Sequence, residues 1–229
     1  MLNPTANHNG FTLVELLIAM LVGSVIMAAV MTSFQSQHKV YLAQDEVVAM
    51  QQNARVAMDM LVRDIRMAGY DPTGVAGAGF VTATTATQLT FTQDLDDSGG
   101  TYISVSDPVE NNADEKVSYR LNASPAALGR VTGNGVVPQP VADNIVAIEF
   151  YYTLSDGSQV LNPSAAELPL IRSVQVSILA RTAVGDQSYT NTKIYTPASG
   201  VAFNGGNPFN DNFRRQLLTT TVQCRNMGL

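Results

Sequence analysis

Glu15 is the residue of this chain whose position most clearly calls for chemistry. It is the single charged residue in an apolar run over residues 11–34, FTLVELLIAMLVGSVIMAAVMTSF. An acid near the centre of a bilayer costs about 2.5–3.5 kcal/mol on insertion scales, and less toward the edge. A segment that only spans a membrane would not keep such a residue. We therefore expect Glu15 to have a partner that offsets this cost.

A second set of oxygen atoms has the opening spacing of a calcium-binding loop. Asp94, Asp96 and Ser98 occupy the first, third and fifth positions, and Gly99 provides the sharp turn that follows. The twelfth position, where such a loop carries a bidentate Glu, is Val105. A calcium site and an acidic turn between two strands both explain these residues, and the sequence leaves both interpretations open.

Catalytic groups are scarce in the rest of the chain. It holds two histidines, His8 and His38, and one cysteine, Cys224, which excludes an internal disulfide and a multi-cysteine zinc site. Cys224 lies in a strand-like run, where a buried apolar role is expected. The sequence contains no evident Ser/His/Asp, Cys/His or paired-carboxylate arrangement. We therefore do not expect an enzyme, and we expect no cofactor apart from the calcium ion considered above.

The charge balance argues against a nucleic-acid partner. The formal net charge is −6, the isoelectric point is about 4.8, and the Lys and Arg residues are scattered. Binding to a phosphate backbone needs a basic patch, and this sequence has none. The adjacent Arg214 and Arg215 are expected to form a solvated basic pair near the chain end, with an acidic partner as the alternative.

Two helical patterns follow one another along the first third of the chain. Residues 11–34 are apolar on all sides and long enough to cross a bilayer, for which about 20 apolar residues suffice. An apolar stripe at spacings of three and four then predicts an amphipathic helix over residues 35–70. Gly69 is expected to end this helix in a left-handed cap, and Pro72 prevents its resumption. The stripe consists of Val40, Ala43, Val47, Met50, Ala54, Ala57, Leu61, Ile65 and Ala68.

Strand-type patterns replace the helical ones after Pro72. The runs are rich in Val, Ile, Thr, Tyr and Phe, and several of them alternate between apolar and polar residues. A helix followed by strands predicts an α+β fold in which a loop-rich antiparallel sheet packs on the helix. Loops are expected at residues 72–79, 122–140 and 197–212. The expected strands are residues 87–92, 117–121, 145–154, 171–181, 188–196 and 217–224.

The start of the chain resembles the processing signal of type IV pilins and the related pseudopilins. Gly10 precedes Phe11, and the residues from Thr12 to Glu15 lead into the long apolar run. The resemblance implies cleavage between Gly10 and Phe11 by the prepilin peptidase, which also methylates the new amino group of Phe11. Glu15 would be the fifth mature residue, where the family needs an acid for methylation or assembly. A neighbouring subunit's Phe11 amine would neutralise it within a low-dielectric helix bundle.

Three further segments resemble PilW-type minor pilins. They are residues 53–70, residues 144–152 followed by Asp156-Gly157, and residues 214–226. The leader departs from the family pattern in lacking Lys and Arg. The resemblance implies four parts: a cleaved leader (1–10), a transmembrane and assembly helix (11–34), an amphipathic helix (35–70) and a β-rich globular pilin domain (71–229).

The function implied by this resemblance is that of a minor pilin in the initiation and assembly of a type IV pilus. Its implied partners are the prepilin peptidase, other minor pilins, the major pilin and the inner-membrane assembly platform. The precursor would be a single-pass protein of the bacterial inner membrane with its globular domain outside the cytoplasm, and would later reach the pilus and cell surface. The alternatives are a J-like pseudopilin of a type II secretion system and a pilus-tip adhesin or binding module.

Overall fold

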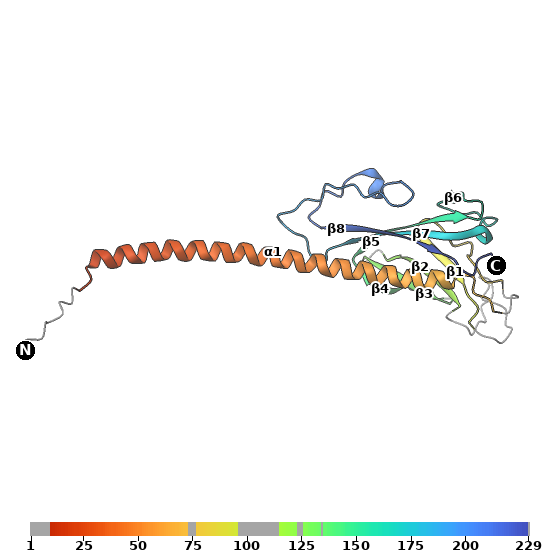
Figure 1. Cartoon of the computed structure of the whole chain (residues 1–229), viewed down its shortest axis with the longest axis horizontal. Coiled ribbons are helices and arrows are strands. Elements are labelled where there is room, and N and C mark those ends of the chain that lie inside the picture. The colour runs from red at the N-terminus through yellow and green to blue at the C-terminus, as the bar shows by residue number, and fades with distance from the viewer. Residues whose placement is uncertain (1–9, 73–76, 96–114, 123–125, 134, 229) are drawn as a thin grey trace, which may run out of the picture. The chain divides into compact units, whose positions relative to one another are not determined.

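The computed structural model describes residues 10–72, 77–95, 115–122, 126–133 and 135–228. The chain divides into two compact units, residues 1–45 and 46–229, and each is described here by itself. The elements are labelled in Figure 1. They are α1 (Leu13–Met67), β1 (Gln88–Thr92), β2 (Lys116–Asn122), β3 (Ala127–Thr132), β4 (Gln139–Asp143), β5 (Ile145–Leu154), β6 (Gln159–Val160), η1 (Leu168–Leu170), β7 (Ile171–Arg181), η2 (Phe203–Gly206) and β8 (Arg215–Gln223).

The first unit contains the apolar part of α1. This part of the helix reaches a mean hydropathy of 2.5 over 18 residues and is long and apolar enough to cross a membrane. Its hydroxyl groups are satisfied locally, because the Ser24 hydroxyl donates to the Leu21 carbonyl at 2.7 Å and the Thr32 hydroxyl donates to the Ala28 carbonyl at 2.9 Å. Such bonds suit a helix in lipid, where no water is available to bind polar groups.

The second unit begins within α1, where the helix turns one apolar face to the strands. Its buried residues recur at the expected spacing and are Met50, Ala54, Ala57, Met58, Leu61 and Ile65. Val47 is partly buried against the same core, whereas Val40, predicted to lie in the stripe, is 54% exposed. The helix ends as predicted, since Gly69 has a φ of +76°. A Cβ atom there would lie 2.6 Å from the Met227 sulfur, so the site requires glycine on two grounds.

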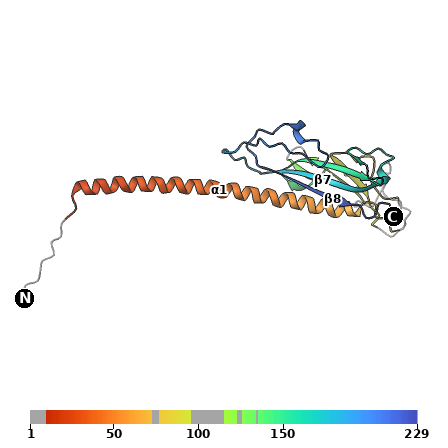
Figure 2. The ribbon, with the colours of Figure 1, turned by 45° about the horizontal axis from the view of Figure 1, so that its top comes forward.

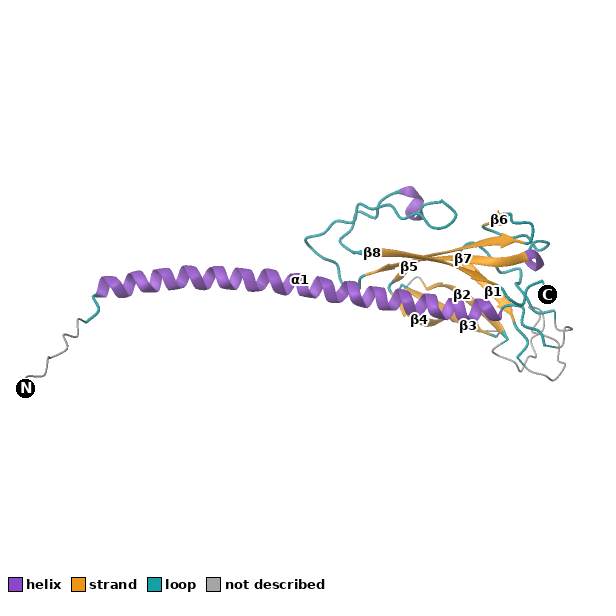
Figure 3. Cartoon of the chain, viewed as in Figure 1, coloured by secondary structure: helices purple, strands orange, loops and turns teal. Residues whose placement is uncertain are grey.

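Within the residues that the structure describes, the strands form two antiparallel sheets of four strands each (Figure 3). The first sheet has the order β1-β2-β3-β4 and the second has the order β6-β5-β7-β8. Figure 2 shows β7 and β8 side by side, and they pair from Ser173↔Gln223 to Arg181↔Arg215. One core cluster contains residues of α1 and of both sheets, among them Leu61, Phe91 and Phe150. The fold is therefore α+β with the helix packed on antiparallel strands, as the sequence predicts.

The strand prediction at residues 188–196 was wrong, and β3, β4 and β6 were not predicted. Residues 188–196 form no strand, because side chains take up the local hydrogen bonds: the Ser188 hydroxyl donates to Asp186, and the Asn191 amide donates to Tyr195 and to the Phe213 carbonyl. Conversely, β3 lies inside the predicted loop 122–140. The Gly, Pro and Asn content of residues 122–140 predicted a loop, but Gly129 lies within β3, so close to Pro138 that a Cβ atom would clash.

Candidate functional site

The predicted processing site lies just before the first helical residue. Gly10, Phe11 and Thr12 adopt no regular structure, and α1 begins at Leu13. Gly10 is exposed and Phe11 is 92% exposed. The peptide bond between Gly10 and Phe11 is thus accessible within the described part of the first unit, as a protease substrate must be.

Glu15 has a hydrogen-bond partner in its own chain. Its Oε2 atom accepts from the Thr12 backbone N–H at 2.9 Å and from the Thr12 hydroxyl at 2.8 Å. In return, the Glu15 backbone N–H donates to the Thr12 hydroxyl at 3.3 Å. These reciprocal bonds form a capping box, which satisfies donors that a helix N-terminus leaves unpaired. The Thr-x-x-Glu spacing is the sequence signal for this capping box, whereas the partner expected from the sequence lay in another subunit.

Hydrogen bonds between side chains and backbone groups attach the second part of α1 to the β-rich part of the second unit. Glu46 accepts from the backbone N–H groups of Ala183 and Val184 at 3.0 and 3.1 Å. Near the other end, Asn226 donates its side-chain amide to the Arg66 carbonyl at 3.0 Å. These contacts could not be predicted from local sequence patterns, because each joins residues more than 130 positions apart.

Asp64 forms the most buried of these attachments. Its Oδ2 accepts from Arg130 Nε at 2.8 Å and from the Tyr119 hydroxyl at 2.6 Å. Burial and the neighbouring Asp64 carboxylate raise the pKa of Tyr119 well above its usual range, so Tyr119 keeps its proton and donates it to this bond. The Asp64 carboxylate therefore accepts one hydrogen bond from a neutral donor on β2 and one from a charged donor on β3.

The predicted calcium loop is only partly described. Asp94 lies just after β1 with 2% of its surface exposed, and its backbone N–H donates to the Tyr70 carbonyl at 2.7 Å. Its Oδ2 atom has no hydrogen-bond partner among the described residues. The other predicted ligands, Asp96 and Ser98, lie outside the described residues. Within the described ranges, no three His, Cys, Asp or Glu residues lie close enough together to hold a metal ion.

The expectation of a solvated basic pair at Arg214 and Arg215 was wrong. Arg215 is only 3% exposed and binds both carboxylate oxygens of Asp211, at 2.5 and 2.6 Å. Arg214 binds Asp186 at 2.7 Å. Both acids lie in the connection between β7 and β8, so the two arginines fix that connection and do not face an outside partner. Cys224 is buried, as predicted.

Two protein families match the chain. The prokaryotic N-terminal methylation motif matches residues 5–31. The family of type IV pilus-assembly protein W matches residues 109–226, just over half of the chain. The chain belongs to this PilW family. The type IV-like pilin TTHA1219 from Thermus thermophilus is similar in structure, with a TM-score of 0.51, 16% identity, and coverage of 78% of this chain and 97% of that chain. No curated protein sequence matches the chain.

Membership in this family confirms the resemblance to PilW-type pilins, and the N-terminal motif and the segments 144–152 and 214–226 lie within the matched residues. Residues 53–70 lie outside both matches. The long apolar helix and the antiparallel sheets have the type IV pilin-like fold. Family and fold are those of pilus-related structural proteins that interact with other pilus components. The methylation motif and the apolar N-terminal helix are consistent with a membrane-anchored pilin.

Proposed function

We propose that this protein is a minor pilin that takes part in the initiation and assembly of a type IV pilus. The observation that carries the proposal is the presence, in one chain, of a methylation motif at the start of an apolar helix and of a PilW-family domain. The precursor waits in the bacterial inner membrane with its globular domain outside the cytoplasm. It then enters the pilus and reaches the cell surface together with other minor pilins.

The first step is processing between Gly10 and Phe11. The prepilin peptidase hydrolyses this exposed peptide bond, leaves a carboxylate on Gly10 and creates an amino group on Phe11, which it then methylates. The methylated amine keeps its positive charge at neutral pH. Cleavage therefore places a new cation at the end of the apolar helix, four residues before the acid at position 15.

The second step is pairing between subunits. The Phe11 amine of one subunit approaches Glu15 of the next, and a charge pair in a low-dielectric helix bundle is tolerated where a lone acid is costly. Thr12 does not block this step. In the described part of the chain both Thr12 hydrogen bonds end on Oε2 of Glu15, so Oε1 can accept an incoming amine while the capping box remains closed. The pair would set the axial register between neighbouring subunits.

The proposal is tested by replacing Glu15 and examining sheared filaments. Glu15→Ala should insert into the membrane at the normal level but be absent from filaments. Asp45→Ala removes an exposed acid from the same helix and serves as the matched control, which should be incorporated normally. Mass spectrometry of the incorporated wild-type protein should find a chain that begins at methylated Phe11. Normal incorporation of Glu15→Ala would contradict the proposed role of the acid.

A deletion strain separates pilus assembly from the related secretion role. Loss of surface pili and of twitching with normal exoprotein secretion supports the assembly role. Loss of exoprotein secretion with normal pili would instead assign the chain to a type II secretion system as a J-like pseudopilin. Normal pili that fail to bind a surface would favour the tip adhesin.

We also propose a calcium ion at Asp94. Support comes from its buried Oδ2 atom, which lacks a hydrogen-bond partner in the described part of the chain, because a buried carboxylate oxygen without a partner is costly. Asp96 and Ser98 would supply further oxygen ligands. The thermal midpoint of the full chain in detergent should rise with CaCl2 and fall with EGTA. The thermal midpoint of Asp94→Asn should change with neither CaCl2 nor EGTA. A wild-type midpoint that CaCl2 and EGTA leave unchanged would contradict the proposed calcium site.

A further inference from the structure

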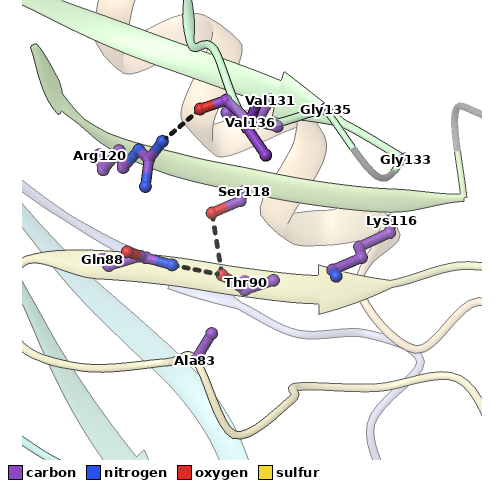
Figure 4. A pocket seen from close by; sticks show the side chains of 10 residues that line it. All are labelled: Ala83, Gln88, Thr90, Lys116, Ser118, Arg120, Val131, Gly133, Gly135 and Val136. Carbon is purple, nitrogen blue, oxygen red and sulfur yellow. Dashed lines mark hydrogen bonds between the residues drawn. The ribbon is translucent and has the colours of Figure 1, made fainter. Parts of the chain in front are cut away.

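An open recess of about 320 Å³ lies on one face of β1 and β2 in the second unit (Figure 4). Figure 4 shows Thr90 and Ser118 at its centre, with Arg120 toward one end and Lys116 toward the other. The recess is lined by Ala83, Gln88, Thr90, Lys116, Ser118, Arg120, Val131, Gly133, Gly135 and Val136.

The alternation of the two strands places these polar side chains together. Leu89 and Phe91 of β1 and Val117 and Tyr119 of β2 are fully buried in the core. Since successive side chains of a strand point to opposite faces, the residues between them project from the other face of the sheet. The register then brings Gln88 opposite Arg120 and Thr90 opposite Ser118.

The floor of the recess is built from hydroxyl and amide groups. The Thr90 and Ser118 hydroxyls lie 2.9 Å apart and share a hydrogen bond, and the Gln88 amide donates to Thr90 at 3.4 Å. Thr90 and Ser118 are 1% and 8% exposed, so their positions are fixed. Each hydroxyl group can still take part in a further hydrogen bond, and the Gln88 carbonyl can accept one as well.

Two cations flank this floor without an acid between them. None of the ten lining residues is Asp or Glu, although the whole chain carries a net charge of −6. Among the described residues, neither Lys116 nor Arg120 takes part in a salt bridge. Arg120 is held in place by a neutral partner, since its Nη2 donates to the Val136 carbonyl at 2.7 Å. Both cations are half-buried and remain available to an anion.

We propose that this recess binds a short acidic oligosaccharide. Lys116 and Arg120 are four strand residues apart, about 13 Å at a rise of about 3.3 Å per residue, which suits a ligand whose carboxylates are spread along a length of about three sugar rings. Guanidinium groups match carboxylates in a forked geometry. The sugar hydroxyls would bond to Gln88, Thr90 and Ser118. The volume lies at the lower end of the usual range for small-ligand sites, about 300–1,000 Å³.

Two other ligand classes fit these residues less well. A single-stranded nucleic acid needs aromatic side chains on which its bases stack, and none of the lining residues is aromatic. An acidic peptide added as a strand needs a free sheet edge beside the recess. The β1 edge is already in use, because the Val81 N–H donates to the Thr90 carbonyl and the Thr92 N–H donates to the Gly79 carbonyl. This inference does not depend on the proposed assembly role.

The test is a titration of the full chain in detergent with trigalacturonic acid, by calorimetry, with neutral maltotriose as the matched probe. The acidic trisaccharide should bind, should weaken as salt is raised, and should outcompete maltotriose. Lys116→Gln and Arg120→Gln should each weaken binding by about tenfold or more, as for loss of one charge-assisted contact. Arg63→Gln removes an exposed cation from α1 and should leave binding unchanged.

A second variant covers the case in which Arg120→Gln fails to fold, because Arg120 also supports the Val136 carbonyl. Arg120→Lys keeps the charge but loses the forked geometry, and it should bind with intermediate affinity. The proposal would be overturned if maltotriose bound as tightly as trigalacturonic acid. It would also be overturned if wild type, Lys116→Gln and Arg120→Lys bound trigalacturonic acid with the same affinity. Tighter binding of a poly-Glu peptide with the same dependence on Lys116 would overturn it as well, and would assign the recess to an acidic protein segment.

Discussion

Thr12 and Glu15 bind each other at the first turn of α1, with the Thr12 backbone N–H and hydroxyl both donating to the same carboxylate oxygen, at 2.9 and 2.8 Å. A carboxylate at a helix N-terminus is also favoured by the helix dipole. The capping box thus offsets part of the cost of an acid in lipid before any neighbour arrives. Under the proposed function, this bond would allow a precursor with Glu15 in its apolar run to persist in a membrane as a separate subunit.

Thr12→Ala should loosen the first turn of α1 while leaving the acid in place. Loss of an N-cap side chain costs about 1 kcal/mol, which corresponds to about fivefold faster opening of the terminal turn. Amide hydrogen exchange in detergent should detect this at Glu15, whose N–H donates to the Thr12 hydroxyl. Thr12→Ser keeps the hydroxyl and serves as the control. Equal exchange rates at Glu15 in wild type and Thr12→Ala would show that the capping box does not stabilise the first turn of α1.

Patterns confined to one element were predicted well from the sequence. The apolar stripe from Val47 onward, the end of α1 at Gly69, and the bounds of β5 and β7 all follow from local periodicity or from a single special residue. Each of these signals depends on residues that are neighbours on one helix face or one strand. The burial of Cys224 followed from the strand-like run around it for the same reason.

Relationships between distant segments could not be predicted in the same way. The division into two sheets depends on which strands pair, and no local pattern encodes that choice. The Asp64 contacts with Tyr119 and Arg130 join residues 55 and 66 positions apart. The recess between Lys116 and Arg120 likewise depends on the register between β1 and β2. Arg214 looked solvated because its partner Asp186 lies 28 positions away, whereas Asp211 lies only four positions before Arg215 and was a local signal that was missed.

Asp64→Asn should destabilise the second unit. The Asp64 and Arg130 side chains are only 18% and 24% exposed, and loss of the charge leaves Arg130 without its ion pair. A hydrogen bond to a charged group contributes about 1.5–3 kcal/mol, so a loss of that size in the free energy of unfolding is expected. Tyr119→Phe should cost about 1 kcal/mol, because it removes one neutral donor. Urea unfolding followed by near-ultraviolet circular dichroism measures both changes.

Asp59→Asn is the matched control for this measurement, because Asp59 is an exposed acid on the same part of α1. An exposed substitution away from a specific contact usually changes stability by less than about 0.5 kcal/mol. If Asp64→Asn were as mild as Asp59→Asn, the contact with Arg130 would not contribute to the attachment of the helix to the first sheet.

Acid should loosen the connection between β7 and β8. Hydrogen bonds from Ser188 and the Arg214 guanidinium lower the pKa of Asp186 to about 2, and the hydrogen bonds from Arg215 lower the pKa of Asp211. The unfolded value is about 3.9. Because the folded pKa values are the lower ones, this stabilisation is fully present above about pH 4 and is lost as the pH falls toward about 2.

The thermal midpoint should therefore fall as the pH is lowered through this window. Asp211→Asn should flatten part of the decline, because its side chain no longer titrates. The decline should not disappear, since hydrogen bonds donated by Ser158 and Ser164 also lower the pKa values of Asp156 and Glu167. Melting curves between pH 5 and pH 2 test this, and parallel curves for wild type and Asp211→Asn would contradict it.

Cys224 should be inert to thiol reagents while the protein is folded. The side chain is 4% exposed, and burial raises the pKa of the thiol to about 12. The thiolate is the reactive form, and at pH 8 only about one thiol in 10⁴ would be ionised at this pKa. Labelling with a maleimide should therefore require unfolding, and Asp64→Asn should accelerate it because the less stable chain opens more often.

Gln52→Cys places a thiol on the exposed face of α1 and should react at once. Rapid labelling of the native wild-type chain would mean that the core around Cys224 opens without unfolding of the domain.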